Sequence, residues 1–238
     1  MPTITQRSTL GEIVTSDPSL ARDLERRGLD YCCGGARTIA EACADQGLDV
    51  DAVLADLVDL GAEDGQPTPA WTSMAAGELI DHIESTHHRY LWRELPRLSA
   101  LIEKVRSVHA ARHPELHQVA SCFAALRVDL EPHLVKEERV LFPMIRELLG
   151  ATTMPVFHCG SLRNPISMME REHDDAGELL ARLRELTNHH TPPADGCRSY
   201  EMLYRGLAEL DSDTRLHVHK ENNVLFPMVE RIEDELAS

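Results

Sequence analysis

A twelve-residue phrase occurs twice in this chain and constrains its fold more than any other feature. It reads HLVKEERVLFPM from His133 and HVHKENNVLFPM from His217, so eight of the twelve letters agree across a separation of 84 residues. Each copy places a histidine four residues before a glutamate, and on an α-helix such residues lie on one face, one turn apart. The repeat therefore predicts two equivalent helices, each presenting an imidazole and a carboxylate from the same face.

The regions around both copies show helical periodicity, and turn-forming residues separate them. We predict helices over about 73–107, 114–149, 165–188 and 196–236. Four long helices with short connections favour an up-and-down four-helix bundle, and the low aromatic content of 4 % suits helices packed through aliphatic side chains. Pro96, Pro143 and Pro227 lie inside these helices, and each is expected to bend its helix because its amide hydrogen is missing. The predicted fold class is all-α.

The first 62 residues have the signals of a separate, small helical domain. Thr9 precedes Glu12, and Thr38 precedes Glu41, in the spacing typical of capping boxes at the starts of helices. Between these two starts lies DYCCGG, a glycine-rich turn with two adjacent cysteines. Glycines, prolines and a lack of periodicity favour a linker over residues 63–71. We therefore predict a helical domain over 1–62, a linker over 63–71 and a four-helix bundle over 72–238.

The composition narrows the possible partners. The chain has 40 acidic and 24 basic residues, a net charge of -16, and no run of Lys and Arg. We therefore expect no binding to nucleic acid, because a phosphate backbone attracts basic surfaces. No apolar stretch reaches the roughly 18 residues that a membrane span needs, and the N-terminus lacks a hydrophobic signal core. The six cysteines include one close pair, which indicates reduced thiols, and we expect a cytoplasmic protein that does not bind membranes.

The other two predicted helices each offer a single histidine in phase with an apolar face. From His173, the residues three, seven and ten positions later are all apolar. The same steps from His88 meet three leucines, whereas from the adjacent His87 they meet a tyrosine and two charged residues, so the phase selects His88. Repeat symmetry selects Glu137 over Glu138, whose counterpart in the second copy is an asparagine. Six residues are thus predicted to converge in the bundle core: His88, His133, Glu137, His173, His217 and Glu221.

These six side chains have the composition of a metal site. A lone buried histidine is more often a hydrogen-bonded core residue than a ligand, but the duplicated spacing favours joint use. Four imidazoles and two carboxylates exceed the four ligands of a closed zinc site, and a mixed nitrogen and oxygen set suits iron or manganese. Two ions bridged by the carboxylates would lie roughly 3.5–4 Å apart, as in other two-metal sites. Each ion would keep an open position, where dioxygen, nitric oxide or peroxide can bind.

Together these features resemble a hemerythrin-type di-iron domain, with single histidines on the first and third helices and H-x-x-x-E on the second and fourth. DYCCGG followed by that bundle is similar to the iron-sulfur cluster repair di-iron proteins, the repair of iron centres family. Phrases such as LIDHI, EREHDDAGELL and NHHTPPADGC support the likeness over nearly the whole chain. One departure is the longer segment over 150–165, where His158 and Cys159 have no place in the family pattern and leave open a further ligand or contact.

The resemblance carries expectations about cofactor and partners. It implies that the six residues bind two non-haem iron ions, bridged by the carboxylates and by an oxo group. It also implies damaged iron-sulfur proteins as partners and nitric oxide or dioxygen as small ligands. A homodimer is one possible assembly.

The adjacent cysteines allow two interpretations. Cys32 and Cys33 cannot both point into one core, so at least one thiol is expected to be accessible. From spacing alone, a tight turn that uses cysteine as a small apolar residue is as good an interpretation as a reactive or metal-holding dithiol. Arg37 is a candidate for lowering a thiol pKa. The family resemblance implies that both cysteines serve iron transfer or redox coupling. Three further cysteines are interpreted as packing residues: Cys43, Cys122 and Cys197.

Three functions remain open from the sequence. The first is repair of iron-sulfur clusters damaged by nitrosative or oxidative stress, by supplying or handling iron and without a catalytic residue. The second is hemerythrin-like binding or sensing of oxygen or nitric oxide, and the third is reduction of nitric oxide at the two irons. Oxygen carriers of the family use five histidines and lack the DYCCGG module, which favours the first function.

Overall fold

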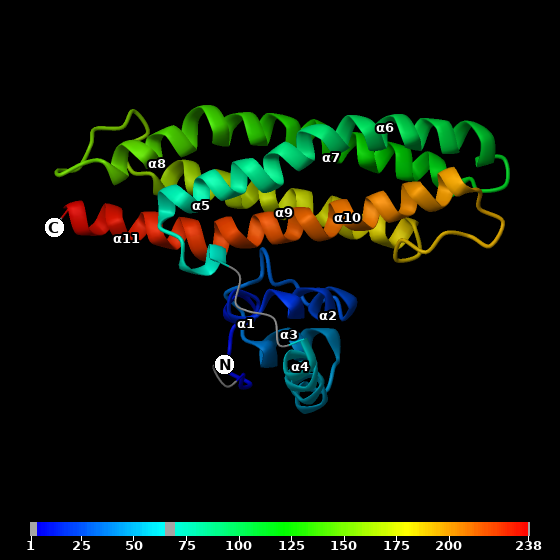
Figure 1. Ribbon diagram of the computed structural model, residues 1–238, viewed down its shortest axis with the longest axis horizontal. Helices are drawn as coiled ribbons and strands as arrows, with labels where there is room; N and C mark the ends of the chain where they lie inside the picture. Colours follow the sequence, from blue (N-terminus) through cyan, green and yellow to red (C-terminus); the bar gives the residue numbers. More distant parts are fainter. Residues whose placement is uncertain (1–3, 65–69, 238) are drawn as a thin grey trace. The chain divides into compact units, whose positions relative to one another are not determined.

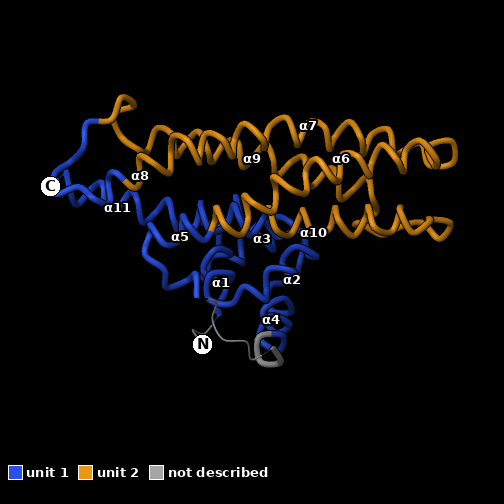
Figure 2. The backbone as a smooth tube through the Cα atoms, turned by 45° about the horizontal axis from the view of Figure 1, so that its top comes forward, with its two compact units in different colours: residues 1–82, 147–156, 215–238 blue, residues 83–146, 157–214 orange. Residues whose placement is uncertain are grey.

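The computed structural model describes residues 4–64 and 70–237 of the chain, and Figure 1 labels its elements. The described residues form helices, with two isolated bridges and no strand among them, which confirms the all-α prediction. The chain divides into two compact units, coloured in Figure 2: unit 1 contains residues 1–82, 147–156 and 215–238, and unit 2 contains residues 83–146 and 157–214. Every helix in the described part is too short or too polar to cross a membrane.

Unit 2 is a bundle of four antiparallel helices (Figure 1). They are α6 (Arg89–His109), α7 (Glu115–Lys136), α9 (Arg163–Leu186) and α10 (Arg198–Lys220), the last of which belongs to this unit up to Thr214. Leucines from all four helices fill the core between them, among them Leu95, Leu126, Leu180 and Leu207. This confirms the predicted up-and-down four-helix bundle, because each helix buries one apolar stripe against its neighbours.

In the described part of the chain, π-helical turns interrupt the long helices at Glu84–His88 (η3), Glu137–Leu141 (η4) and Glu221–Leu225 (η5). Helices α8 (Phe142–Leu149) and α11 (Phe226–Ala237) follow η4 and η5, each with a proline as second residue. Proline lacks an amide hydrogen and its ring crowds the carbonyl four residues earlier, and a wider turn before it relieves that crowding. The sequence predicted only a bend at these two prolines, whereas the structure has a π-turn before each.

The N-terminal part of unit 1 consists of short helices. They are α1 (Leu10–Ser16), η1 (Pro18–Leu20), α2 (Ala21–Arg26), α3 (Ile39–Gln46) and α4 (Val50–Asp64). Both predicted capping boxes are present, at Thr9 and Thr38. Helix α4 extends into the first residues of the predicted linker, and residues 65–69 lie outside the described residues. Ala70–Ser73 (η2) and Ala76–Ile83 (α5) follow along the chain.

The core of unit 1 joins the N-terminal helices to the last turn of α10. Val218 packs among the aliphatic side chains of these helices and is 3 % exposed. His219 is buried beside it, with Nδ1 3.4 Å from the carbonyl oxygen of Tyr31 and Nε2 3.1 Å from the hydroxyl of Thr15. The carbonyl can only accept, so Nδ1 carries the proton and Nε2 accepts from the hydroxyl. Burial lowers the pKa of His219 to about 4, and the ring therefore stays neutral at neutral pH.

The buried His219 predicts a pH dependence of stability. Its folded pKa of about 4 lies below the value of about 6.5 expected in the unfolded chain. Between these values the unfolded state binds a proton that the folded state does not, so this residue destabilises the fold increasingly as pH falls from 6.5 to 4, by up to about 3 kcal/mol. Urea unfolding from pH 7 to 4 should show a shallower loss of stability in His219→Gln. The exposed His117→Gln should keep the slope of the unchanged protein, and equal slopes in all three proteins would contradict the assignment.

Candidate metal centre

Glu137 is the first residue of the π-turn η4 in unit 2, and its side chain is fully buried. Its Oε2 atom lies 3.3 Å from Nε2 of His133, one helical turn earlier on α7. The same oxygen lies 3.4 Å from Nε2 of His88, the last residue of η3. Two imidazoles from different helices therefore present nitrogen atoms to one carboxylate oxygen inside the bundle.

His173 of helix α9 joins this group through its contact with His133. Its Nε2 lies 3.1 Å from Nε2 of His133, and both rings are about 1 % exposed. One nitrogen or oxygen atom from each of His133, Glu137 and His173 lies within 4.8 Å of the others. Unit 2 thus brings together four of the six residues that the sequence predicted as ligands.

The outer nitrogens of two of these histidines face carboxylates. Nδ1 of His88 lies 3.2 Å from Oε1 of Glu138, and Nδ1 of His133 lies 3.0 Å from Oε2 of Glu172. A carboxylate at Nδ1 holds the proton on that atom, so that Nε2 presents its lone pair to the interior. The hydrogen bond from His133, together with Lys136, lowers the pKa of Glu172 to about 2, and the bond from His88 lowers the pKa of Glu138. Both carboxylates therefore stay ionised in their supporting role.

The remaining two predicted ligands lie together in unit 1. His217 is on the last turn of α10, and Glu221 begins η5 directly after it. Nε2 of His217 lies 3.0 Å from Oε1 of Glu221, and both side chains are fully buried. This is the same arrangement that the first copy of the repeat adopts at His133 and Glu137, with the glutamate opening a π-turn in each case. Turns of this kind occur frequently at functional sites.

Residues next to the predicted ligands have other roles. His87 is buried like His88, but its Nδ1 bonds to Oδ1 of Asp213 at 3.0 Å, which agrees with the choice of His88 by phase. The supporting residues Glu138 and Glu172 were not predicted. A glutamate directly before or after a candidate ligand is the sequence signal that could have found them, but most such glutamates face solvent.

The donor set fits a pair of cations. Buried carboxylates such as those of Glu137 and Glu221 cost free energy unless a positive charge offsets them. His88 and His133 present their Nε2 atoms inward and carry their protons on the outer side, as metal-binding histidines do. Buried groups of histidine and glutamate in this structure can therefore hold a di-iron centre.

Loss of an outer carboxylate should weaken iron binding without removing a ligand. We expect Glu172→Gln to lower the affinity for iron about 10- to 100-fold, because His133 loses the anion that fixes its tautomer. Competition with a chelator of known affinity measures this. Glu185→Gln, on the exposed end of the same helix α9, is the matched control and should bind iron as before. Equal affinities in both variants would exclude the supporting role of Glu172.

The adjacent cysteines lie on the turn between α2 and α3. Cys32 is buried and Cys33 is half-buried, which confirms that one thiol is accessible. Their Sγ atoms are 3.9 Å apart, and Oδ1 of Asp30 lies 3.0 Å from Sγ of Cys32. The contact with Cys33, followed by burial, raises the pKa of the Cys32 thiol. Arg37 lies before the start of α3 and pairs with Asp45 of that helix, and the pKa of Cys32 is raised rather than lowered.

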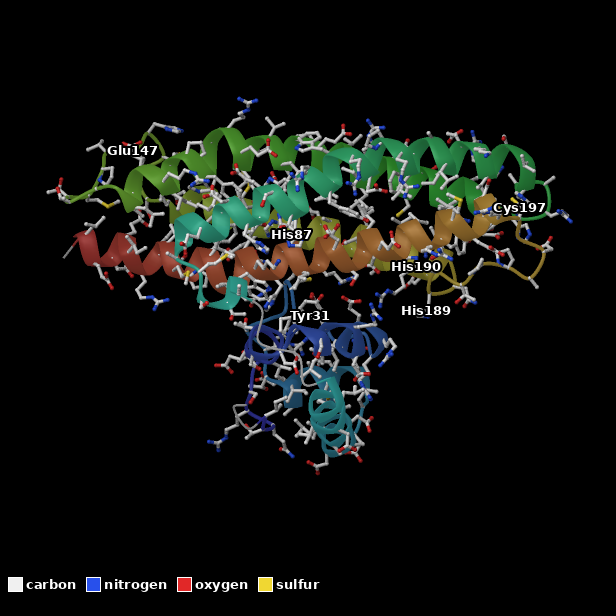
Figure 3. All side chains as sticks on the ribbon, in the orientation of Figure 1. Tyr31, His87, Glu147, His189, His190 and Cys197 are labelled. Atoms are coloured by element: carbon white, nitrogen blue, oxygen red, sulfur yellow. The ribbon has the colours of Figure 1, made fainter. Side chains whose placement is uncertain are left out.

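The cysteine turn is bound to η5 within unit 1. Nδ2 of Asn223 donates to the carbonyl oxygens of Cys32 at 2.9 Å and of Tyr31 at 3.3 Å, and Tyr31 is labelled in Figure 3. A Cβ atom on Gly35 would lie 2.0 Å from Oδ1 of Asn223, so only glycine permits this approach. The turn that carries both thiols therefore contacts the turn that begins with Glu221.

The insertion over 150–165 contributes no ligand within the described residues. His158 is exposed, Cys159 is half-buried, and neither belongs to a group of potential metal-binding side chains in that part of the chain. Cys43 is buried as expected, and Cys122 is half-buried. Cys197 is exposed, so the prediction of a packing role was wrong for this residue.

Comparison with known proteins matches both parts of the chain to family models. Residues 79–229 match the family model of the hemerythrin HHE cation binding domain, and residues 6–61 match that of a Domain of Unknown function (DUF542). The chain is 41 % identical over 219 residues to the iron-sulfur cluster repair protein YtfE of Enterobacter sp. (strain 638), covering 92 % of this chain and 94 % of the relative. It belongs to the iron-sulfur cluster repair family.

Other members of this family are similarly close. The iron-sulfur cluster repair proteins YtfE of Citrobacter koseri and of Escherichia coli O1:K1 / APEC are each 38 % identical over 218 residues, with 92 % of this chain and 94 % of each relative covered. The hemerythrin-type domain binds iron, and its match spans every predicted ligand from His88 to Glu221. Family membership and the buried histidine and glutamate groups together confirm the prediction of a di-iron cofactor.

Proposed function

We propose that this protein repairs damaged iron-sulfur clusters by supplying iron from a di-iron centre. The relatives that it matches over nearly their whole length are named for cluster repair, and damaged iron-sulfur proteins are therefore its targets. The observation that carries the proposal is the buried carboxylate of Glu137 between the Nε2 atoms of His88 and His133. The cytoplasm is the proposed location, which suits the six cysteines that the structure leaves as thiols.

The proposed ligands are the six residues of the repeated hairpins. His88, His133, Glu137 and His173 lie in contact in unit 2, while His217 and Glu221 pair in unit 1 on the continuation of helix α10. The repeat supports their joint use, because each copy of the phrase supplies one histidine and one glutamate in the same buried geometry. Two irons held this way supply exchangeable coordination positions.

Release of iron requires ligands that open to the surface. Glu138 and Glu172 are each about a quarter exposed, although the histidines that they support are buried. Each of these rings is therefore hydrogen-bonded to a carboxylate that reaches solvent. A movement of that carboxylate loosens the ring without disturbing the apolar core. We propose that His88 and His133 are the ligands that release iron first.

The cysteine turn is the proposed exit for iron. One ligand atom from each of Asp30, Cys32 and Cys33 lies within 4.8 Å of the others, which is a suitable group to hold an iron ion in transit. Because the pKa of Cys32 is raised, its thiol stays protonated until a metal displaces the proton. The hydrogen bonds from Asn223 support transfer between η5 and this turn, because they hold the two turns together.

A cluster reactivation assay tests the proposal. An enzyme whose [4Fe–4S] cluster was destroyed with nitric oxide should recover activity when mixed with the iron-loaded protein and a reductant. The double variant Cys32→Ser, Cys33→Ser should keep its iron and reactivate the enzyme more slowly. Recovery at the same rate with iron-free protein, or with the same amount of free iron alone, would contradict repair by iron supply.

A second candidate function is the binding of nitric oxide or dioxygen. Six protein donors leave two irons short of full coordination, and that count favours access for small ligands. Mixing the reduced protein with air or with nitric oxide distinguishes the two functions. A stable, reversible adduct in a protein that fails the reactivation assay would favour the second.

A further inference from the structure

Cys197 lies at the start of helix α10, at the end of the bundle in unit 2. Its side chain is exposed, and its carbonyl oxygen accepts the first intrahelical bond, from the amide of Glu201 at 3.0 Å. Figure 3 labels this residue beside the first turn of the helix. A thiol at the N-cap of a 23-residue helix lies at the positive end of the helix dipole.

The thiol has a buried imidazole as its partner. Nε2 of His109, at the end of α6, lies 3.2 Å from Sγ of Cys197, and the histidine is only 5 % exposed. The ring meets the buried ring of Tyr200 edge-on, with centroids 5.3 Å apart at 79°. Packing against Tyr200 therefore fixes the direction in which Nε2 points.

The other nitrogen of this ring decides where the proton lies. Nδ1 of His109 is buried and has no hydrogen-bond partner among the described residues. A buried N–H without an acceptor is less readily tolerated than a buried acceptor without a donor, so the neutral ring carries its proton on Nε2. That N–H then donates to the sulfur, and a thiolate is the better acceptor because the bond becomes charge-assisted.

Nearby acidic charge is already compensated. Asp195 lies two residues before Cys197, and its carboxylate contacts Nε2 of His113 at 2.9 Å and the guanidinium of Arg112 at 3.4 Å. This carboxylate is therefore paired with His113 and Arg112 rather than with the thiol.

We propose that Cys197 is a reactive thiol that is reversibly capped by small disulfides such as glutathione disulfide. The thiolate sulfur of Cys197 attacks one sulfur of RSSR, a new sulfur–sulfur bond forms as the old one breaks, and RS⁻ leaves. The Cys197 sulfur is oxidised and the leaving sulfur is reduced, so no further oxidant is needed. This reactivity is separate from the iron site and from the adjacent cysteine pair.

The geometry separates this dyad from hydrolytic cysteine sites. In those sites a third group bonds to the outer nitrogen of the histidine and stabilises the imidazolium that forms. Nδ1 of His109 has no such group among the described residues, so the ring stabilises the thiolate without acting as an efficient base. The pair also falls outside the groups of potential metal ligands in the described part of the chain.

Quantitative mapping of mixed disulfides tests the proposal. The full-length, iron-loaded protein is treated with limiting glutathione disulfide, blocked with an alkylating agent, digested, and analysed at each cysteine by mass spectrometry. The half-buried Cys159 serves as an internal reference in every sample. His109→Gln and His109→Met form a matched pair of similar size, since glutamine can donate to the sulfur and methionine cannot.

The expected result is that Cys197 is capped faster than Cys159 in the unchanged protein. His109→Met removes the hydrogen bond to the attacking sulfur and should slow capping of Cys197 about threefold, whereas His109→Gln should largely preserve the rate because glutamine can donate to the sulfur. Equal rates in the methionine and glutamine variants would show that exposure alone sets the reactivity and would overturn the proposal. If circular dichroism shows that both variants are misfolded, the comparison of cysteines in the unchanged protein is the test. Capping of Cys197 no faster than capping of Cys159 then overturns the proposal.

Discussion

The double variant His133→Leu, Glu137→Leu should purify without iron from cells in which the unchanged protein carries about two iron ions per chain. His133 and Glu137 contact each other, and Glu137 also contacts His88. The variant therefore removes two proposed ligands and the carboxylate that His88 contacts. Iron analysis by mass spectrometry, together with loss of the near-ultraviolet absorption of the centre, measures the effect. The iron-free variant should remain folded, because leucines replace a buried polar group with apolar surface.

The control for this variant lies two residues before His133 on the same helix. Glu131 pairs with Arg127 on the outer face of α7, and both are about one third exposed. Glu131→Leu should therefore keep both irons and the same melting temperature within a few degrees. Retention of two irons in the His133→Leu, Glu137→Leu variant would show that the assigned ligands are not needed for the centre.

Gly35→Ala should detach the cysteine turn from η5. The added Cβ atom would lie 2.0 Å from Oδ1 of Asn223 and 2.7 Å from the carbonyl oxygen of Tyr31. The asparagine can move only by giving up its bonds to the turn, and the backbone carbonyl cannot move freely, so the expected cost is about 1–3 kcal/mol. Alkylation of the buried Cys32 should accelerate about tenfold or more, since each 1.4 kcal/mol of local opening is a factor of ten.

Two further variants isolate the cause of that effect. Gly77→Ala places its Cβ at an ordinary 3.7 Å from a methyl group of Leu149, and it should leave alkylation of Cys32 unchanged. Asn223→Ala in the Gly35→Ala background removes the closest clash, so the two changes together should cost less than the sum of each alone. Strict additivity would indicate that Gly35 and Asn223 act independently and would contradict the docking contact.

The sequence predicted those features that rest on periodicity. Helical phase selected His88 over His87, and the structure places His88 at Glu137 and His87 at Asp213. The spacing of four residues placed His217 against Glu221, as observed. These placements follow from the pattern because a helix face depends only on local geometry, whereas iron binding by these residues stays a prediction.

Features that depend on residues far apart in the sequence could not be predicted from periodicity. His109 and Cys197 are 88 residues apart, and no local pattern links them. The π-turns also escaped prediction, because proline indicates a disturbed helix but does not specify how the helix accommodates it.

One missed signal was present in the repeat itself. The first copy has Val135, Glu138 and Arg139 where the second has His219, Asn222 and Asn223. In the second copy these three residues contact the N-terminal helices or the cysteine turn. The positions at which two copies differ thus marked the surface on which the N-terminal part of unit 1 docks.

Anomalous diffraction at the iron edge, from crystals of protein grown with ample iron, would test the central claim most directly. Two neighbouring peaks are expected, contacted by the imidazole nitrogens of four histidines and the carboxylates of two glutamates: His88, His133, His173, His217, Glu137 and Glu221. A single peak, or iron bound away from these side chains, would contradict the assignment of a di-iron centre to the repeated hairpins.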